Sequence, residues 1–462
     1  MTHQEADPGA DGRATGLLTD HYELTMVRAA LRDGVAGRRA VFEVFARDLP
    51  LGRRYGVVAG TGRFLDALRR FRFPGRDLEF LLRTGVIDEP TASYLESYRF
   101  TGSIWGYAEG DCYFPGSPIL VVEGTFAEAV MLETLTLSIF NHDCAIAGAA
   151  ARMVSAAGSR PIIEMGSRRT HELAAVAAAR AAWICGFAST SNLRAGQEFG
   201  VPTTGTSAHA FTLVHDDEPH AFAAQLDSLG TGTTLLVDTY DVPAAVRAAV
   251  ALAGPALGAV RIDSGDLPVV ARQVRAQLDA LGATATRIVV TSDLDEYAIA
   301  GLAAAPADGY GVGTALVTGS GAPAAGLVYK LAARGTDPAG GGPALPVAKR
   351  SEGKPTIGGR KWPVRSFDAE GVAVAEAIRT EPPETGRHDE RPLLVELVRE
   401  GRVIGGEPLA AARERHRAAL AELPEHALRL SRGHPAIPTI FESQPGSPGT
   451  WPDLPAGDFR AG

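Results

Sequence analysis

The chain has 462 residues, 45% of them hydrophobic, which is enough for a large core divided among two or three structural units. Its 45 Lys and Arg against 54 Asp and Glu give a formal net charge of −9, which argues against the basic surface of a nucleic-acid-binding protein. The three cysteines lie far apart and none has CxxC spacing, which argues against a disulfide framework or a zinc site: Cys112, Cys144 and Cys185.

Neither a signal peptide nor a membrane span is expected. Residues 1–15 are polar and acidic, contain no apolar run, and predict a loose tail. The most apolar long segment, Phe126–Val154, contains ionisable residues at five positions: Glu128, Glu133, His142, Asp143 and Arg152. It therefore predicts a pair of buried helices, and the default expectation is a cytoplasmic enzyme.

Residues 16–125 suit a mixed N-terminal α+β domain. Val41–Phe45 alternates like a strand, and helical patterns follow around Phe64–Phe71 and Leu78–Arg83. A β-rich run with glycine-containing turns then extends from Phe100 to Val122.

A regular alternation of strand and helix patterns follows the helical entry at Phe126–Ala157. The strand candidates are Pro161–Glu164, Gly186–Ala188, Val201–Thr204, Thr234–Asp238, Ala259–Asp263, Arg287–Ser292 and Gly309–Gly311. Residues 126–330 therefore predict a catalytic (β/α) barrel, with a doubly wound open sheet as the alternative. That alternative has little support, because no GxGxxG follows a first strand and no Walker A motif occurs.

The pattern changes beyond Val317. Residues 331–380 predict a β-rich, lysine-bearing segment that packs on the N-terminal unit, and residues 381–462 predict a helical extension, with a helix at Leu409–Leu423, and a tail. The predicted fold class is α/β: an irregular (β/α) barrel with an N-terminal α+β domain and a small C-terminal extension.

The lysines are few and clustered. Only four of the 45 cationic residues are lysines, and all fall within 32 positions: Lys330, Lys349, Lys354 and Lys361. A lysine ammonium is a compact point charge, so the cluster indicates contacts to phosphate, with compositional bias as the alternative. Whether these side chains touch phosphates or only the surface stays open.

Polar residues follow the strand candidates, where the loops of a (β/α) barrel build the active site. They are Arg168, Arg169, Ser191, Asn192, Thr206, Ser207, His209, Asp238, Tyr240, Asp241, Arg261, Asp263, Ser264, Asp266, Ser292, Asp293 and the glycine-rich Gly311–Thr314. Arginines, hydroxyls and backbone amides suit anions, and a histidine can act as base or nucleophile. Anion donors together with several carboxylates indicate a Mg²⁺-bound polyphosphate sugar.

Structural roles compete for some of these residues. One of the two adjacent arginines could pair with a nearby acid such as Glu172. Aspartate suits a helix N-cap, which is the favoured interpretation for two of the acids, Asp241 and Asp266. Two further histidines lie amid acidic residues and are expected on the solvated surface, His215 and His220.

Seven segments carry specific motifs: Leu18–Met26, Gly166–Arg169, Thr190–Asn192, Gly205–His209, Arg261–Asp266, Gly311–Thr314 and Lys354–Lys361. In this combination the chain resembles the nicotinate phosphoribosyltransferase family, from about Leu17 to Arg365. The residues after about Arg379 add little to the resemblance.

The resemblance implies a type II phosphoribosyltransferase with an irregular α/β barrel, usually dimeric. It implies that nicotinate reacts with 5-phosphoribosyl 1-diphosphate to give nicotinate mononucleotide and diphosphate in NAD salvage. It also implies that Mg²⁺ is required and that ATP is a co-substrate, hydrolysed through a phosphorylated histidine. We therefore expect a homodimer that acts on small molecules, without a nucleic-acid or membrane partner.

The motifs assign the implied roles to residues of this chain. The catalytic residues are His209, as the phosphorylated histidine, and Asp263, on the ribosyl or base side. Nicotinate contacts are expected from Tyr22, Met165, Arg168, Thr206 and Arg261, with Tyr22 stacking on the ring from its own or a neighbouring subunit. Contacts to phosphoribosyl diphosphate are expected from Ser191, Asn192, Ser264, Ser292, Gly311, Gly313 and Thr314. Metal ligands are not assigned.

One position departs from the family pattern. Met165 stands where related enzymes often carry an aromatic residue, although a thioether can still pack on a π face. Nicotinamide or quinolinate as the base is the alternative among enzymes, and quinolinate would require more cationic residues around the ring. A non-catalytic nucleotide sensor on the same fold is a further alternative, opposed by the presence of His209 and of the Asp263 loop.

Overall fold

The computed structural model describes residues 14–340, 342–349, 357–383 and 387–442. Most of the predicted N-terminal tail lies outside these residues. Thr15, its last residue, is buried, and its hydroxyl donates to the carbonyl of Ala67 at 2.7 Å. The described end of this segment is therefore anchored and not loose.

The N-terminal half is built around a seven-stranded antiparallel sheet with the order β13-β12-β1-β5-β3-β17-β18. Its strands are β1 (Arg39–Ala46), β3 (Ser103–Tyr107), β5 (Leu120–Thr125), β12 (Leu327–Gly335), β13 (Ala344–Pro346), β17 (Leu394–Arg399) and β18 (Arg402–Val403). The surrounding elements are α1 (His21–Asp33), η1 (Pro50–Gly52), α2 (Thr61–Arg69), α3 (Gly75–Arg83), α4 (Glu89–Glu96) and the strand pair β2 (Gly56–Val57) with β4 (Cys112–Tyr113). The predicted strand at Val41–Phe45 and both predicted helices are confirmed.

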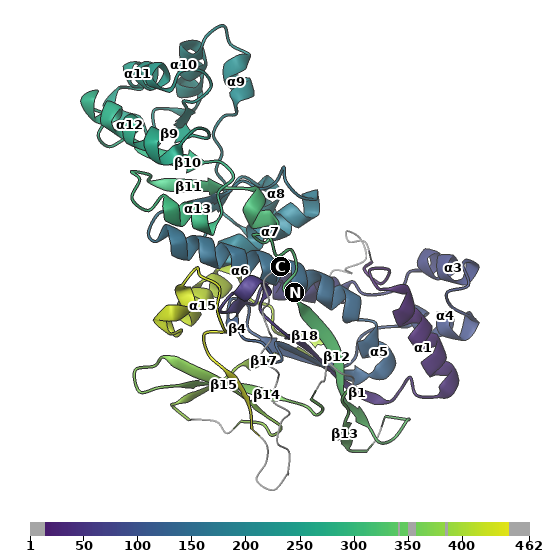
Figure 1. Ribbon diagram of the computed structural model, residues 1–462. Coiled ribbons are helices and arrows are strands. Elements are labelled where there is room, and N and C mark those ends of the chain that lie inside the picture. The colour runs from purple at the N-terminus through teal and green to yellow at the C-terminus, as the bar shows by residue number, and fades with distance from the viewer. Residues whose placement is uncertain (1–13, 341, 350–356, 384–386, 443–462) are drawn as a thin grey trace, which may run out of the picture.

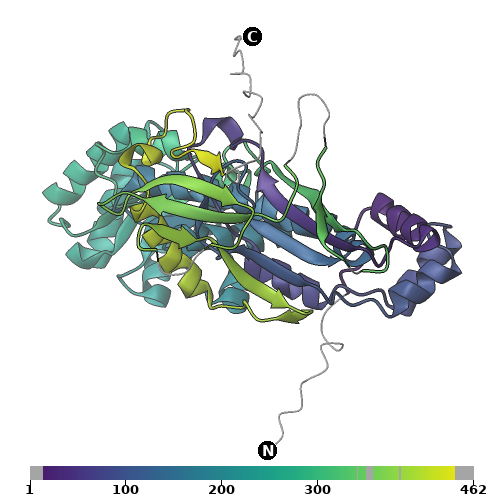
Figure 2. The ribbon, with the colours of Figure 1, turned by 90° about the horizontal axis from the view of Figure 1, so that it is seen from below.

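Segments from the C-terminal part of the chain complete this sheet. β12 pairs with β1, and β17 pairs with β3. A separate sheet with the order β16-β14-β15-β19 contains β14 (Trp362–Phe367), β15 (Ala373–Arg379), β16 (Glu390–Pro392) and β19 (Thr439–Phe441). Figure 2 shows its yellow-green strands nearest the viewer when the molecule is seen from below. The predicted C-terminal helix is confirmed as α15 (Leu409–Ala421), followed by η3 (Glu425–Leu428). The predicted domain boundaries stay a prediction.

Two helices join the halves, as the apolar segment predicts. α5 (Phe126–Val130) begins with a capping box in which Thr125 and Glu128 satisfy each other's backbone amides. α6 (Glu133–Ala157) follows, and most of its side chains are buried. Its first half packs in the N-terminal core and its second half in the core of the parallel sheet. Figure 1 shows α6 crossing the middle of the molecule between these two parts.

The second half is a parallel half-barrel of six strands with the order β7-β6-β11-β10-β9-β8. The strands are β6 (Ile162–Glu164), β7 (Ser189–Thr190), β8 (Thr234–Leu236), β9 (Ala259–Ile262), β10 (Arg287–Thr291) and β11 (Gly309–Val312). The helices are α7 (Glu172–Ile184), α8 (Leu193–Phe199), α9 (His209–Leu213), α10 (Glu218–Leu229), α11 (Val242–Ala253), α12 (Leu267–Ala280), α13 (Glu296–Gly301) and α14 (Thr314–Val317), with η2 (Gly254–Ala256) after α11.

The half-barrel has one strand fewer than the sequence pattern predicts. Val201–Thr204 is not a strand; it contacts the sheet through a single bridge between Thr190 and Thr203. Its residues after Val201 are exposed. Since no apolar side chain beyond Val201 is buried there, nothing extends the bridge into a ladder, and β7 and β8 are the edge strands of the sheet within the described residues. Among all the residues that the structure describes, no helix is both long and apolar enough to cross a membrane.

Candidate active site

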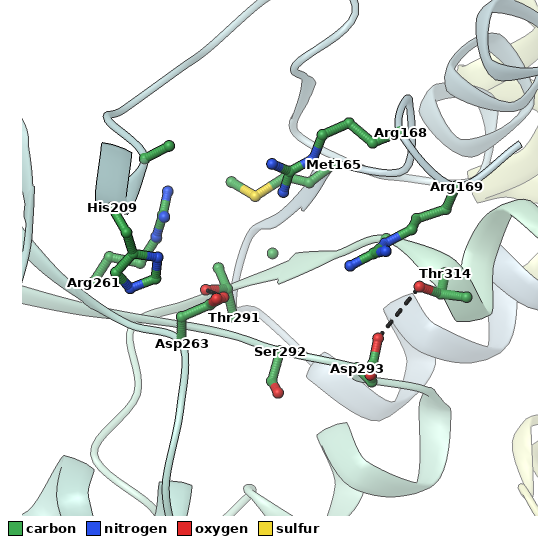
Figure 3. A pocket seen from close by; sticks show the side chains of 13 residues that line it. Met165, Arg168, Arg169, His209, Arg261, Asp263, Thr291, Ser292, Asp293 and Thr314 are labelled. Carbon is green, nitrogen blue, oxygen red and sulfur yellow. Dashed lines mark hydrogen bonds between the residues drawn. The ribbon is translucent and has the colours of Figure 1, made fainter. Parts of the chain in front are cut away.

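The carboxyl ends of the half-barrel strands surround one pocket with a volume of about 220 Å³. Figure 3 shows side chains entering it from the loops after β6, β9, β10 and β11 and from α9. The lining residues are Met165, Arg168, Arg169, Ala208, His209, Arg261, Asp263, Thr291, Ser292, Asp293, Gly311, Gly313 and Thr314. Nine of the predicted site residues thus come together, as expected where parallel strands end at one edge.

Two glycines allow the pocket loops to approach each other. A Cβ atom on Gly166 would lie 2.3 Å from Cγ1 of Val317, and one on Gly311 would lie 2.5 Å from Cγ2 of Thr291 and 2.8 Å from the sulfur of Met165. All three distances are shorter than side-chain contacts permit. Larger residues at these positions would push the strand ends apart and open the floor of the pocket.

A buried carboxylate holds the loops after β6 and β7. Glu164 accepts hydrogen bonds from the hydroxyl of Thr190 and the backbone amide of Gly166. Burial raises the pKa of Glu164, and these two hydrogen bonds oppose the shift. Glu164 therefore acts from beneath the pocket and does not line it.

The adjacent arginines point to different parts of the pocket. In Figure 3 the Arg168 side chain lies beside Met165, whereas Arg169 extends toward Asp293 and Thr314. Within the described residues neither guanidinium has an ion pair, and Glu172 pairs with its neighbour His171 instead. Both arginines are thus available to anions, which the proposed pairing with Glu172 would have prevented.

A third arginine lies deeper. Arg261 donates from Nη1 to the hydroxyl of Thr206, and its buried Nε has no hydrogen-bond partner in the part of the chain that the structure describes. Burial lowers the pKa of Arg261, opposed by the carboxylates of Asp263 and Asp238. A buried N–H group without a partner favours an acceptor supplied by a ligand.

His209 forms a dyad with a carboxylate that the sequence placed at a strand end but not in the site. Nε2 of His209 lies 3.2 Å from Oδ1 of Asp238, whose side chain is only 2% exposed. Oδ2 of Asp238 accepts from the amide of Asp263 at 3.0 Å and from the hydroxyl of Ser264 at 2.6 Å. Asp238 therefore orients the histidine and fixes the loop after β9.

The opposite wall carries two more carboxylates. The hydroxyl of Thr291 donates to Asp263, and the hydroxyl of Thr314 donates to Asp293 at 3.3 Å. Thr291 and Asp293 were not among the predicted site residues. Asp293 belongs to the strand-end series, whereas Thr291 is the last residue of its strand and had no signal beyond that position.

Several predicted residues lie beside the pocket and do not line it. Asn192 caps α8 through the amide of Ala195 and donates to the hydroxyl of Ser167. The others in this group are Ser191, Thr206 and Ser264, whereas Tyr22 belongs to α1 in the N-terminal half, away from the half-barrel in Figure 1. Tyr22 lies on α1, is 45% exposed, and has its pKa raised by partial burial and by the carboxylates of Glu133 and Glu23.

The structural alternatives prove correct for the acids at helix starts. Asp241 accepts from the amide of Ala244, and Asp266 accepts from the amide of Val269, so both are N-caps. His220 is exposed beside Asp217, as predicted. His215 is partly buried and bonds to the carbonyl of Phe211, so it is a structural and not a fully solvated residue.

The lysines have separate environments. Lys361 is 4% exposed and donates to Glu43 at 2.5 Å and to the carbonyls of Ile357 and Gly359. Lys330 donates to the carbonyl of Tyr329, and its Nζ lies 3.9 Å from Oε1 of Glu133. Lys354 lies outside the described residues. Lys361 therefore anchors its segment on β1, and its buried ammonium is taken up by these three acceptors.

The chain resembles known proteins along most of its length. Residues 17–141 match the family described as the nicotinate phosphoribosyltransferase N-terminal domain. A nicotinate phosphoribosyltransferase of Mycobacterium tuberculosis is 57% identical over 445 residues, covering 94% of this chain and 97% of the relative. The chain belongs to the nicotinate phosphoribosyltransferase family.

Other family members agree. The nicotinate phosphoribosyltransferase of Bacillus subtilis is 39% identical over 69% of this chain and 66% of its own length. Among solved structures, human nicotinic acid phosphoribosyltransferase superposes with a TM-score of 0.78 at 26% identity, covering 92% of this chain and 97% of the human chain. The mixed α/β fold with a parallel half-barrel is thus the fold of the family, and the chain is an enzyme of this family.

Proposed function

We propose that this enzyme transfers the phosphoribosyl group of 5-phosphoribosyl 1-diphosphate to nicotinate, releasing diphosphate and coupling the reaction to ATP hydrolysis. The pocket carries the proposal, because it combines arginines without ion pairs and carboxylates in one lining, with His209 beside Arg261 and Asp263. The pyridine nitrogen forms a bond to the anomeric carbon while the carbon–oxygen bond to diphosphate breaks, and diphosphate leaves with the electron pair. Such a displacement needs orientation and charge stabilisation but no covalent ribosyl nucleophile.

The nicotinate carboxylate fits the Arg261 side of the pocket. The unpartnered Nε of Arg261 and the hydroxyl of Thr206 lie together there, and Arg168 adds a second cation. Met165 lies next to Arg168 and offers its thioether to the ring face. This arrangement favours an acid over an amide as the base.

The phosphoribosyl part fits the opposite end, which we call the phosphate end. The loop at Gly313 and Thr314, just past the end of β11, suits the 5-phosphate, with Gly311 and Ser292 lining the pocket beside it. Asp263 faces the middle of the pocket, where it would hold the ribose. The remaining residues predicted to contact phosphoribosyl diphosphate do not line the pocket and would act from behind it: Ser191, Asn192 and Ser264.

His209 is proposed as the residue that ATP phosphorylates. Its side chain is 41% exposed, and Asp238 engages Nε2. With Nε2–H donating a hydrogen bond to Asp238, Nδ1 keeps its lone pair and is the nucleophile toward the γ-phosphate of ATP. The phosphoryl group then bonds to Nδ1 and ADP leaves. The added negative charge beside the diphosphate subsite would favour product formation.

The residues that line the pocket suit an Mg²⁺ ion that binds together with the substrate phosphates. No group of three or more His, Cys, Asp or Glu side chains suited to a metal is found in the described ranges, and Mg²⁺ usually takes one or two carboxylates plus substrate phosphates. Asp263 and Asp293 both line the pocket and would hold it. When bound, Mg²⁺ would neutralise charge on the diphosphate.

The proposal includes a homodimer in the cytoplasm. Tyr22 is half exposed on α1 and absent from the pocket lining of its own chain. Stacking of Tyr22 on nicotinate would therefore come from a second copy that brings α1 to this pocket.

The deciding experiment measures nicotinate mononucleotide formation with Mg²⁺, with and without ATP, and with nicotinamide in parallel. We expect product from nicotinate alone and ADP release that His209→Ala abolishes. Product from nicotinamide, or no product from either base despite binding, would reject the proposal in favour of a different pyridine or of a nucleotide sensor.

A further inference from the structure

A cluster of polar side chains lies where α6, the start of α13 and the turn after α14 meet, next to the loops of the phosphate end. It comprises Arg152, Glu296 and Ser320 and is called the Glu296 cluster here. Arg152 belongs to α6, Glu296 begins α13, and Ser320 follows α14. All three border a second cavity that does not share residues with the active-site pocket.

Glu296 connects the other two members. Its side chain is 3% exposed; Oε1 accepts from Nε of Arg152 at 2.9 Å, and Oε2 accepts from the hydroxyl of Ser320 at 2.5 Å. Arg152 is itself 8% exposed. Both carboxylate oxygens are thus used, one toward the central helix and one toward the turn after α14.

The two loops that Glu296 joins are those that form the phosphate end. Asp293 lies three residues before Glu296, and Thr314 lies at the start of the helix that Ser320 follows. At the pocket surface the hydroxyl of Thr314 donates to Asp293 at 3.3 Å. The loops are therefore linked by hydrogen bonds both in front, at the pocket, and behind, at Glu296.

The turn carrying Ser320 is held tightly. Ser320 has φ +51, a left-handed conformation that is rare for a residue with a Cβ atom, and its amide donates to the carbonyl of Ala315 at 2.6 Å. Arg53, which is buried, donates to the carbonyl of Gly319 at 2.5 Å. Without these bonds the strained turn would relax and move the start of α14.

We infer that Glu296 is a positioning residue that sets the geometry of the phosphate end by holding the Asp293 and Thr314 loops against α6. This inference rests on the proposed function, since it assigns phosphoribosyl diphosphate to that end of the pocket. Glu296 does not touch substrate; it acts through Asp293 and Thr314.

The C-terminal extension takes part in the same cluster. The carbonyl of Leu430 accepts from Nη2 of Arg152 at 2.8 Å and from the hydroxyl of Tyr297 at 3.3 Å. A segment that carries none of the family motifs is thereby joined to the active-site loops. The extension supports the phosphate end through Arg152.

Two variants test the inference by steady-state kinetics. Ser320→Ala removes one hydroxyl and keeps the Cβ atom, so only the bond to Glu296 is lost. We expect KM for phosphoribosyl diphosphate to rise about 3- to 10-fold in Ser320→Ala and about 10- to 100-fold in Glu296→Gln, with KM for nicotinate within about 2-fold of wild type.

Glu376→Gln is the matched control. Glu376 is also buried and accepts from one arginine, Arg365 at 2.6 Å, and one hydroxyl, Tyr107 at 3.2 Å, but lies in the C-terminal sheet away from the pocket. It should lower the melting temperature without a selective change in KM. If Glu296→Gln does not fold, Ser320→Ala decides.

An unchanged KM for phosphoribosyl diphosphate in folded Ser320→Ala would overturn the inference, as would equal rises for both substrates. Absence of turnover in the wild type would instead reject the proposed function, so the two failures are distinguishable.

Discussion

Nε2 of His209 and Oδ1 of Asp238 lie 3.2 Å apart, which leaves Nδ1 of the imidazole as the atom that faces away from the carboxylate. Asp238 is almost fully buried and receives two further hydrogen bonds, from the amide of Asp263 and the hydroxyl of Ser264. Asp238 therefore holds the histidine in one orientation and also holds the loop after β9, which carries Asp263. This dyad links the proposed phosphorylation to the ribosyl subsite.

Replacing Asp238 by Asn should uncouple ATP from turnover. The amide oxygen of an asparagine would stay on the two donors that Asp238 now accepts from, Asp263 and Ser264, so its NH₂ group would face Nε2 of His209. This favours the tautomer with the proton on Nδ1, which then has no lone pair for attack, and we expect ATP-stimulated turnover to fall by about 100-fold or more. Turnover without ATP should persist at a lower level. Phosphohistidine yield from labelled ATP checks this, and NMR of the phosphoprotein should place phosphate on Nδ1. Phosphate on Nε2 would show that the dyad does not direct the reaction.

Arg261→Lys should weaken nicotinate binding selectively. Lysine keeps the charge but loses the planar fork, and a lost charge-assisted hydrogen bond of about 1.5–3 kcal/mol corresponds to about a 10- to 100-fold rise in KM. Arg275→Lys is the control, because Arg275 pairs with Asp279 on α12, outside the pocket lining. Equal effects of the two variants on KM for nicotinate would contradict the assignment.

Tyr22 should act across the subunit boundary. A mixed dimer of Tyr22→Ala and Asp263→Ala subunits contains one intact pocket that can receive Tyr22 from its partner. We expect the purified mixed dimer, with one of its two pockets intact, to regain about half of the wild-type rate, whereas each variant alone stays impaired. No recovery in the mixed dimer would mean that Tyr22 serves its own chain or has no part in catalysis.

Lys361 should matter for stability and not for phosphate binding. Lys361→Met leaves Glu43 buried without its cation, so we expect a loss of about 3–5 kcal/mol in the free energy of unfolding. The double variant Lys361→Met with Glu43→Leu should recover most of it, since a hydrophobic pair replaces the ion pair. Urea unfolding measures both. A raised KM for phosphoribosyl diphosphate in the folded double variant would restore a substrate role to this lysine.

His416 should make stability depend on pH under mildly acidic conditions. Burial lowers the pKa of His416 to about 4, and its Nδ1 faces the carbonyl of Gly110 at 3.1 Å. Between about pH 4 and 6.5 the unfolded chain binds more protons at this residue, so its stability contribution is lost as pH falls through that window. His416→Gln should flatten the pH dependence of the unfolding free energy by up to about 3 kcal/mol. His220→Gln, at the protein surface, is the control; an unchanged slope in His416→Gln would refute the prediction.

Local patterns predicted most elements because each depends on neighbouring residues. The capping box at Thr125 and Glu128 starts α5, and Asp241 and Asp266 cap their helices as the sequence indicates. Listing the polar residues that follow each predicted strand also identified most of the pocket lining, because the carboxyl ends of parallel strands lie on one edge of the sheet. The sequence pattern could not predict that Val201–Thr204 would form only a single bridge to β7, because its residues beyond Val201 are exposed.

The sequence by itself determined the family, the alternation of strands and helices and the residue types of the site, since these depend on motifs and short-range periodicity. Only the tertiary structure decided which residues act together. It turned Arg168 and Arg169 apart, placed Asp238 against His209, and buried Lys361 beside Glu43 on β1. Such choices depend on hydrogen bonds between residues distant in the chain, as with Glu43 and Lys361, and local sequence does not encode their partners.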